Sequence, residues 1–183
     1  MRVLGICGSL RDGSYNRLLL HAGAGELPRG IEFHLYDGLS EIPPYDEDVD
    51  RKAAPQAVRR FRAAIAGADA VLLATPEYNA SVPGALKNAL DWASRPFPDN
   101  VLRGKPVAVV GASTSLFGAV WAQAELRKVL ATIGARVVDE ELPVARAHDV
   151  LAYGVLPAEL RSRLGAMLDH LLESIPPPGE IAA

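Results

Sequence analysis

The 183-residue sequence predicts one three-layer α/β domain, in which helices cover both faces of a parallel sheet. Five short apolar runs alternate with longer amphipathic stretches, which is the pattern of consecutive βαβ units. Three of the runs are apolar throughout, as strands buried on both faces are. About 70 % of the surface of a chain of this size can be buried on folding, which is enough for a single core.

The strands are predicted from the distribution of apolar residues. They cover residues 3–7, 31–36, 70–75, 107–111 and 136–138. The second run alternates, with Ile31, Phe33 and Leu35 on one face and Glu32, His34 and Tyr36 on the other. This alternation indicates a half-exposed edge strand, and the short fifth run is expected at the opposite edge. Interior strands 1, 3 and 4 between edges 2 and 5 give the flavodoxin-like order 2-1-3-4-5.

Five helices are predicted from apolar residues at helical spacing. They begin near Arg17, after Pro55, near Pro83, at Gly118 (with a cap at Gly134) and at Pro157. The domain is therefore expected over residues 1–175, followed by a disordered tail over 176–183. Residues 37–54 follow no such pattern and are expected to form a functional loop. Its acidic run, Asp46, Glu47, Asp48 and Asp50, predicts a solvated loop or, alternatively, a lid over the site.

The composition excludes several classes of function. The formal net charge is −3, so the broad basic surface that binds nucleic acid is not expected. The longest apolar runs are too short to span a bilayer, and the start at Met1 lacks a signal-peptide layout. The single Cys7 excludes an intramolecular disulfide and is expected to be a buried, unreactive strand residue. The four His residues share no metal-ligand spacing, so a cytoplasmic protein without a metal site is expected.

The loop after the first strand has the residue types that bind a phosphate. In open parallel sheets, ligands bind beyond the carboxyl ends of the strands where the strand order reverses, here between strands 1 and 3. The first loop reads Gly8-Ser9-Leu10-Arg11-Asp12-Gly13-Ser14-Tyr15-Asn16. Its hydroxyls, guanidinium and amide precede a helix start, which favours an anion. Since it lacks the dinucleotide fingerprint and the P-loop lysine, it favours a monophosphate. The alternative is a Ser/Gly turn that only caps the helix.

Two further loops complete the predicted pocket. The loop after the third strand reads Thr75-Pro76-Glu77-Tyr78-Asn79-Ala80-Ser81-Val82-Pro83-Gly84. Two prolines stiffen it, so its backbone donors can hold the polar edge of a flat ring at little entropic cost. The alternative is a rigid surface turn that caps the next helix. Residues 111–118, after the fourth strand, are small and polar and provide a third wall.

These loops resemble the NADPH-dependent FMN reductases, a family that includes chromate- and quinone-reducing flavoproteins and related azoreductases. The resemblance covers about residues 2–175 and rests on Gly8–Arg11, Ser14, Asn16, Thr75–Asn79, Ser81–Gly84, Leu86–Ala89 and Asp91-Trp92. It implies that the FMN phosphate is held by Ser9, Arg11, Ser14, Tyr15 and Asn16. It also implies that the isoalloxazine is lined by Pro76, Glu77, Tyr78 and Asn79, with Ser113 beside it.

The resemblance implies an oxidoreductase that passes hydride from NADPH or NADH through bound FMN to a small acceptor. Quinones, azo compounds, metal oxyanions and free flavin are the open possibilities. No catalytic His or Cys is expected, because the flavin supplies the redox chemistry. The family also implies a homodimer or homotetramer, for which Trp92 and Trp121 are interface candidates unless they lie in the core.

Three residues depart from the family pattern. Ser115 and Ala119 replace glycines, and Trp121 stands where arginine is common, which affects nicotinamide preference and oligomer geometry.

Three other functions compete with this interpretation. An electron carrier without its own substrate turnover is disfavoured by the small net charge. An FMN-binding regulator or structural subunit is a further alternative. A serine hydrolase is excluded, because Ser115 stands where the nucleophile elbow needs glycine.

Overall fold

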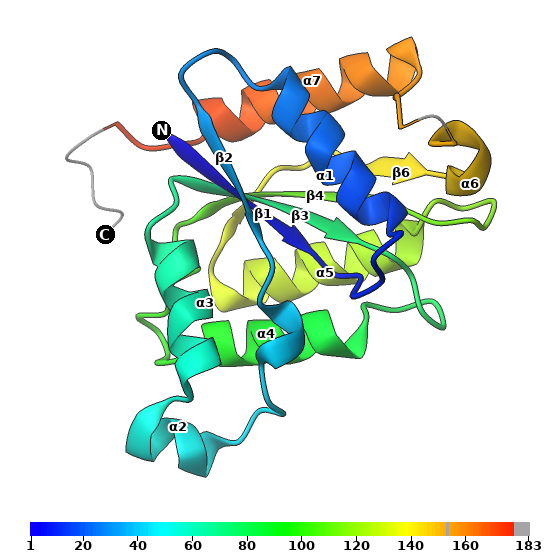
Figure 1. Cartoon of the computed structure of the whole chain (residues 1–183). Coiled ribbons are helices and arrows are strands. Elements are labelled where there is room, and N and C mark those ends of the chain that lie inside the picture. The colour runs from blue at the N-terminus through cyan, green and yellow to red at the C-terminus, as the bar shows by residue number, and fades with distance from the viewer. Residues whose placement is uncertain (153, 178–183) are drawn as a thin grey trace.

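The computed structural model describes residues 1–152 and 154–177, and six strands in this part of the chain form one parallel sheet (Figure 1). The strands are β1 (Arg2–Cys7), β2 (Glu32–Tyr36), β3 (Ala70–Thr75), β4 (Pro106–Ala112), β5 (Arg136–Val137) and β6 (Leu142–Val144). Their order is β2-β1-β3-β4-β5, with β6 also paired to β4, so the predicted flavodoxin-like order is confirmed. Of the predicted tail, residues 178–183 lie outside the described residues.

The strand β6 is an addition to the predicted sheet. It pairs with residues 110–112 at the carboxyl end of β4, whereas β5 pairs with residues 106–107 at the amino end. The edge strand beside β4 is thus divided in two. A polar segment at residues 139–141 separates the halves, and Pro143 inside β6 weakens the strand signal in the sequence. Because β6 lies at the carboxyl end of the sheet, it borders the third predicted loop.

Helices cover both faces of the sheet (Figure 1). They are α1 (Tyr15–Glu26), α2 (Glu47–Ala53), α3 (Gln56–Ala66), α4 (Gly84–Ala93), α5 (Val120–Ile133), α6 (Ala147–Val150) and α7 (Ala158–Glu173), with a 3₁₀ helix at Leu39–Glu41. The core on one face joins the sheet to α3, α4 and α5, and the core on the other joins it to α1, α6 and α7. None of these described helices has the length and apolar character needed to cross a membrane.

The acidic segment expected as a loop forms the helix α2. Asp46 caps it by accepting hydrogen bonds from the backbone N–H groups of Asp48 and Val49. Carboxylates in the first turn interact favourably with the helix dipole. Asp50 forms two hydrogen bonds, of 2.9 and 2.7 Å, with Arg62 of α3, and both side chains are largely buried. The segment is therefore a helix fixed to α3, which no apolar periodicity indicates because α2 buries no apolar residue.

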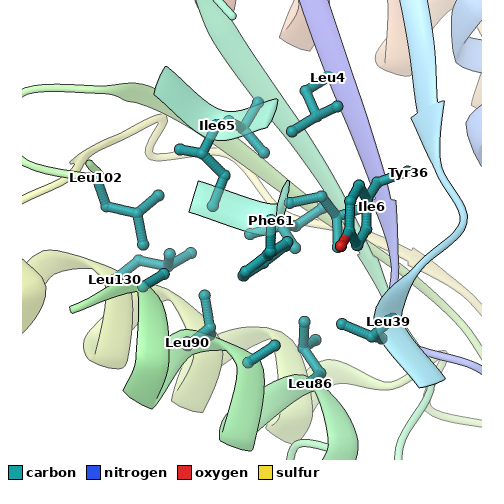
Figure 2. Packing of buried hydrophobic residues seen from close by; sticks show 14 of the residues in the cluster. Leu4, Ile6, Tyr36, Leu39, Phe61, Ile65, Leu86, Leu90, Leu102 and Leu130 are labelled. Carbon is teal, nitrogen blue, oxygen red and sulfur yellow. The ribbon is translucent and has the colours of Figure 1, made fainter. Parts of the chain in front are cut away.

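Two aromatic residues lie deeper than the sequence indicates. Tyr36, placed on the polar face of the second strand, is buried against Phe61 with ring centroids 5.0 Å apart (Figure 2). The 3₁₀ helix after β2 and the helix α3 cover this end of β2. Both faces of the strand are therefore shielded from solvent there. Trp92 is completely buried and donates its indole N–H to the Pro43 carbonyl, which makes it a core residue. Cys7 is buried, as predicted.

Candidate functional site

The three predicted loops meet at the carboxyl ends of β1, β3 and β4 and enclose a cleft of about 110 Å³. Its lining contains nine of the ten predicted site residues, namely Ser9, Arg11, Ser14, Tyr15, Asn16, Pro76, Glu77, Tyr78 and Ser113. The predicted residue outside this lining is Asn79. The strand order places these distant segments side by side, since β1 lies between β2 and β3, and β3 between β1 and β4.

The first loop presents donors around the start of α1. The hydroxyl of Ser14 caps this helix by accepting from the Arg17 N–H at 3.4 Å. The helix therefore begins at Tyr15, two residues before the predicted start, and its first N–H groups have no partner within the helix. Ser9 and Ser14 are both buried. Arg11 is exposed and forms no ion pair with any residue in the described part of the chain.

Close packing beneath the loop favours glycine at position 8. A Cβ atom there would lie 2.8 Å from the Leu86 side chain of α4. The Gly8 N–H also donates to the Ala74 carbonyl at 2.8 Å, which fixes the loop to the end of β3. The backbone of the first loop is therefore held close to the second predicted loop. Buried hydroxyls, an unpaired guanidinium and a helix start fit a phosphate monoester.

Asn16 fixes the first loop to the third. Its side-chain amide donates to the Ala112 carbonyl and accepts from the Ala112 N–H, both at 2.9 Å. This pair of bonds joins α1 to the end of β4 in the interior of the protein. One amide hydrogen and the amide oxygen are therefore used, and Asn16 can offer a ligand its second amide hydrogen or its backbone N–H in the first turn of α1. No local sequence signal indicates this pairing, because the two residues are 96 positions apart.

The second loop is a tight hairpin. Tyr78 and Ser81 exchange two backbone hydrogen bonds of 3.1 Å, and Asn79 and Ala80 at the tip have φ values of 54° and 59°. This is the left-handed pair of a two-residue hairpin turn, which Asn adopts readily and Ala does not. The Tyr78 N–H is used within the hairpin. The Asn79 N–H has no partner among residues 1–152 and 154–177, and the Tyr78 side chain is half exposed.

Glu77 is bound to the start of α5. Its carboxylate accepts from the backbone N–H groups of Trp121 and Ala122 at 3.0 and 3.1 Å. The helix needs this partner because its N-cap residue, Ala119, has no side-chain oxygen and adopts a φ of 62°. Glu77 therefore lines the cleft but acts on α5 in this structure. The signal in the sequence is indirect, in that α5 begins without a capping residue.

The third loop is fixed to β6 and exposes aromatic residues. The Ser113 N–H donates to the Val144 carbonyl at 3.1 Å, and the Ser113 hydroxyl lies 3.1 Å from that of Ser115. The rings of Phe117 and Trp121 pack with centroids 4.8 Å apart, and both are about half exposed. Trp121 therefore presents an aromatic surface close to the cleft.

A larger hollow of about 590 Å³ lies between α2 and residues 95–97, away from the three loops. Two of its arginines are already paired, Arg51 with Glu47 and Arg62 with Asp50. The third, Arg95, forms no ion pair with the described residues, but the carboxylates of Glu47 and Asp50 line the same hollow. The smaller cleft is the better candidate for an anionic ligand.

Among the residues that the structure describes, the two groups with displaced pKa values, Tyr36 and Lys105, lie outside the cleft. Burial raises the pKa of Tyr36, which packs in the core beneath the 3₁₀ helix. Burial lowers the pKa of Lys105, which precedes β4 at the opposite end of that strand from Ser113. Perturbed acids and bases often mark sites whose side chains transfer protons. Neither group faces the three loops.

Comparison with known proteins identifies the family of this chain. The family model described as NADPH-dependent FMN reductase matches residues 1–149. An NAD(P)H-dependent FMN reductase of Pseudomonas aeruginosa is 53 % identical over 130 residues, which are 71 % of this chain and 69 % of that protein. A 2-hydroxy-1,4-benzoquinone reductase of a Burkholderia species is 44 % identical over 131 residues, 72 % of this chain and 70 % of that protein.

A solved structure extends the similarity to almost the whole chain. The flavoenzyme FerB of Paracoccus denitrificans, an NAD(P)H:(acceptor) oxidoreductase, has a TM-score of 0.80 and 36 % identity. The match covers 94 % of this chain and 98 % of FerB. The chain therefore belongs to the NADPH-dependent FMN reductase family.

Proposed function

We propose that this protein is an FMN-dependent NAD(P)H oxidoreductase whose acceptor is a small molecule of the quinone type. The observation that carries the proposal is the cleft at the start of α1, where the hydroxyls of Ser9 and Ser14 lie beside the unpaired Arg11. The names of the similar proteins support the same activity, since one is an FMN reductase and another a benzoquinone reductase. We assign the FMN-binding domain to residues 1–175.

The phosphate end of FMN is held by the first loop. Ser9 and Ser14 supply hydroxyls, Arg11 supplies a cation, and the backbone N–H groups of Tyr15 and Asn16 point from the first turn of α1. The cleft is smaller than the roughly 300–1,000 Å³ of an enclosing ligand pocket. It would therefore hold the phosphate end, and the hairpin at residues 78–81 would line the ring.

The ring is positioned by the hairpin and by the third loop. Pro76 and Glu77 give one wall, Tyr78 gives an aromatic surface, and the free Asn79 N–H is a donor for the polar edge of the ring. Ser113 approaches from the end of β4. When bound, FMN supplies the chemistry of accepting hydride from a nicotinamide and passing it to an acceptor.

The protein contributes position and electrostatics. The charged residues that line the cleft are Arg11 and Glu77, and the Glu77 carboxylate is bound to the start of α5. We therefore assign no general acid or base to the reaction. A backbone donor at the tip of the hairpin stabilises negative charge on the reduced ring, as the donors of an anion hole do.

Exposed apolar residues on all three loops support an aromatic acceptor and a subunit contact. Leu10, Tyr78, Leu116, Phe117 and Trp121 are each about half exposed or more. We propose that these residues border the space shared by the nicotinamide and the acceptor. We also propose a cytoplasmic homodimer or homotetramer, with Phe117 and Trp121 at the contact between subunits.

The proposal is tested with the purified protein. It should have the absorbance spectrum of bound FMN and should oxidise NADPH or NADH when a benzoquinone is present, without a second protein. A parallel panel with an azo dye, a metal oxyanion and free FMN ranks the acceptors. Bound flavin that is not reduced by either nicotinamide would contradict the proposal and would favour an electron carrier.

A further inference from the structure

In the hairpin at residues 78–81, Ala80 adopts a backbone conformation that alanine disfavours. Ala80 has a φ of 59°, in the left-handed region where a Cβ atom approaches the carbonyl oxygen that follows it. Only the two bonds between Tyr78 and Ser81 close the turn from within. An alanine at such a position persists when surrounding contacts hold it there. Contacts from outside the turn must therefore hold the tip.

The contact on the returning side of the hairpin is made by Glu125 of α5. One carboxylate oxygen, Oε2, accepts from the Ser81 hydroxyl at 2.7 Å and from the Val82 backbone N–H at 3.3 Å. Val82 is buried, so this is the point at which the exposed hairpin enters the core. The short bond to Ser81 is of the charge-assisted kind, which is stronger than a bond between neutral groups.

Two carboxylates thus join the hairpin to α5. One belongs to the hairpin loop and accepts from α5, and the other belongs to α5 and accepts from the loop. Glu77 reaches from the outgoing side of the hairpin to the N–H groups of Trp121 and Ala122. Glu125 lies four residues after Trp121, on the same face of α5, and reaches back to the returning side. The tip between these two attachments contains Tyr78 and Asn79.

The surroundings of Glu125 place it outside the cofactor cleft. It is exposed and lines a separate hollow between α4 and α5, together with Lys128 and the ion-paired Lys87 and Asp91. It is not among the residues that line the cleft. Its effect on a ligand in the cleft must therefore pass through Ser81 and Val82.

We propose that Glu125 is a positioning residue that holds the hairpin in the geometry required by the flavin ring. This inference rests on the proposed function, in which the hairpin lines the ring. Glu125 keeps the Asn79 N–H and the Tyr78 ring at a fixed place relative to the first loop. Without it the tip relaxes, and the reduced ring loses more stabilisation than the oxidised ring, because the reduced ring carries the negative charge that a donor stabilises.

The test compares Glu125→Ala, Glu125→Gln and Ser81→Ala with the wild-type protein. In Glu125→Ala, FMN binding should weaken about tenfold, and the midpoint potential of the bound flavin should become more negative. Glu125→Gln keeps an acceptor oxygen for Ser81 and should restore most of both properties. The double variant Glu125→Ala/Ser81→Ala should match Glu125→Ala alone, since Glu125→Ala already removes the partner of the Ser81 hydroxyl. Glu159→Ala, which removes an exposed carboxylate from α7, is the matched control.

Hydrogen exchange in the flavin-free protein gives a readout that does not depend on turnover. The Glu125→Ala change should accelerate exchange of the Ser81 and Val82 amides, whereas Glu159→Ala should leave them unchanged. A lower Tm together with unchanged FMN affinity and unchanged potential would overturn the inference, because Glu125 would then only stabilise the fold. A failure of the proposed function is distinguishable, since the wild-type protein itself would then bind no FMN in the same titration.

Discussion

Arg11 is the residue on which the phosphate assignment depends most. It is exposed at the cleft and forms no ion pair with the other described residues, so its charge is available to a ligand. Arg11→Ala should weaken FMN binding by about 2–3 kcal/mol, or roughly 30- to 150-fold, because a charge-assisted contact is lost. Fluorescence titration of the flavin-free protein measures this. Arg29→Ala, which removes another exposed arginine, should bind FMN normally; equal affinity in both variants would refute the phosphate assignment.

Tyr36 gives a prediction about stability. Its hydroxyl is buried and has no hydrogen-bond partner among the described residues. Tyr36→Phe should therefore raise the free energy of unfolding by about 1 kcal/mol near neutral pH, as judged by urea denaturation. Lower stability in the variant would show that the hydroxyl has a partner.

The same residue predicts a pH dependence. Burial raises the pKa of Tyr36 above its ordinary value of 10.0, so the folded state keeps the proton after the unfolded state has begun to lose it. The contribution of Tyr36 to the free energy of unfolding is therefore constant below about pH 10 and falls as the pH rises further. Tyr36→Phe should remove this part of the alkaline loss. Parallel stability profiles for the two proteins above that pH would contradict the assignment.

At the scale of elements, α5 depends on a carboxylate from another loop. Glu77→Ala should destabilise the flavin-free protein by about 1 kcal/mol, a typical cost of losing a helix cap. Glu77→Gln keeps an acceptor and should cost less. Urea denaturation without flavin separates this effect from any effect on ligand binding. An unchanged midpoint in Glu77→Ala would show that water replaces the cap without cost.

The elements that the sequence predicts are those with long apolar patterns. The strands β1, β3 and β4 are continuous apolar runs, and α3 buries Val58, Phe61 and Ile65 at helical spacing. The helix α2 and the strand β6 were not predictable in the same way. The helix α2 buries no apolar side chain, and β6 has three residues including a proline.

The site was predictable as three loops but not as a set of contacts. The rule that ligands bind at the switch point of a parallel sheet, together with the loop composition, located the cleft. The bonds of Asn16 to Ala112 and of Glu77 to α5 join residues more than 40 positions apart. Such pairings depend on the packed fold and leave no local periodicity. Tyr36 was placed on the polar face of β2 for a similar reason, because the 3₁₀ helix that covers it has no strong sequence signal.

At the scale of the molecule, the exposed aromatic surface predicts association. Trp121 and Phe117 form an apolar surface next to the cleft. Trp121→Asp should shift the protein toward the monomer at micromolar concentration in sedimentation experiments, because a charge would be desolvated at the contact. Val49→Asp, in α2 at the far corner of the molecule (Figure 1), is the control and should leave association unchanged. A wild-type protein that sediments as a monomer would rule out the proposed oligomer.

The net charge of −3 is consistent with the proposed function of the whole molecule. The proposed cofactor needs positive potential at one point, the Arg11 guanidinium beside the start of α1, and the bound flavin supplies the reactive group. A near-neutral surface is compatible with small, uncharged acceptors such as quinones. It offers little of the strongly charged face that electron carriers use for docking.

The most direct test of the proposed function separates the two half-reactions. The FMN-bound protein is mixed without oxygen with NADPH or NADH alone, and after removal of the oxidised nicotinamide it is mixed with a benzoquinone. The flavin absorbance should disappear in the first step and return in the second, with steady-state kinetics of the ping-pong type. If the flavin stays oxidised with both nicotinamides, or is reduced only when a separate reductase is added, the protein is not an NAD(P)H oxidoreductase.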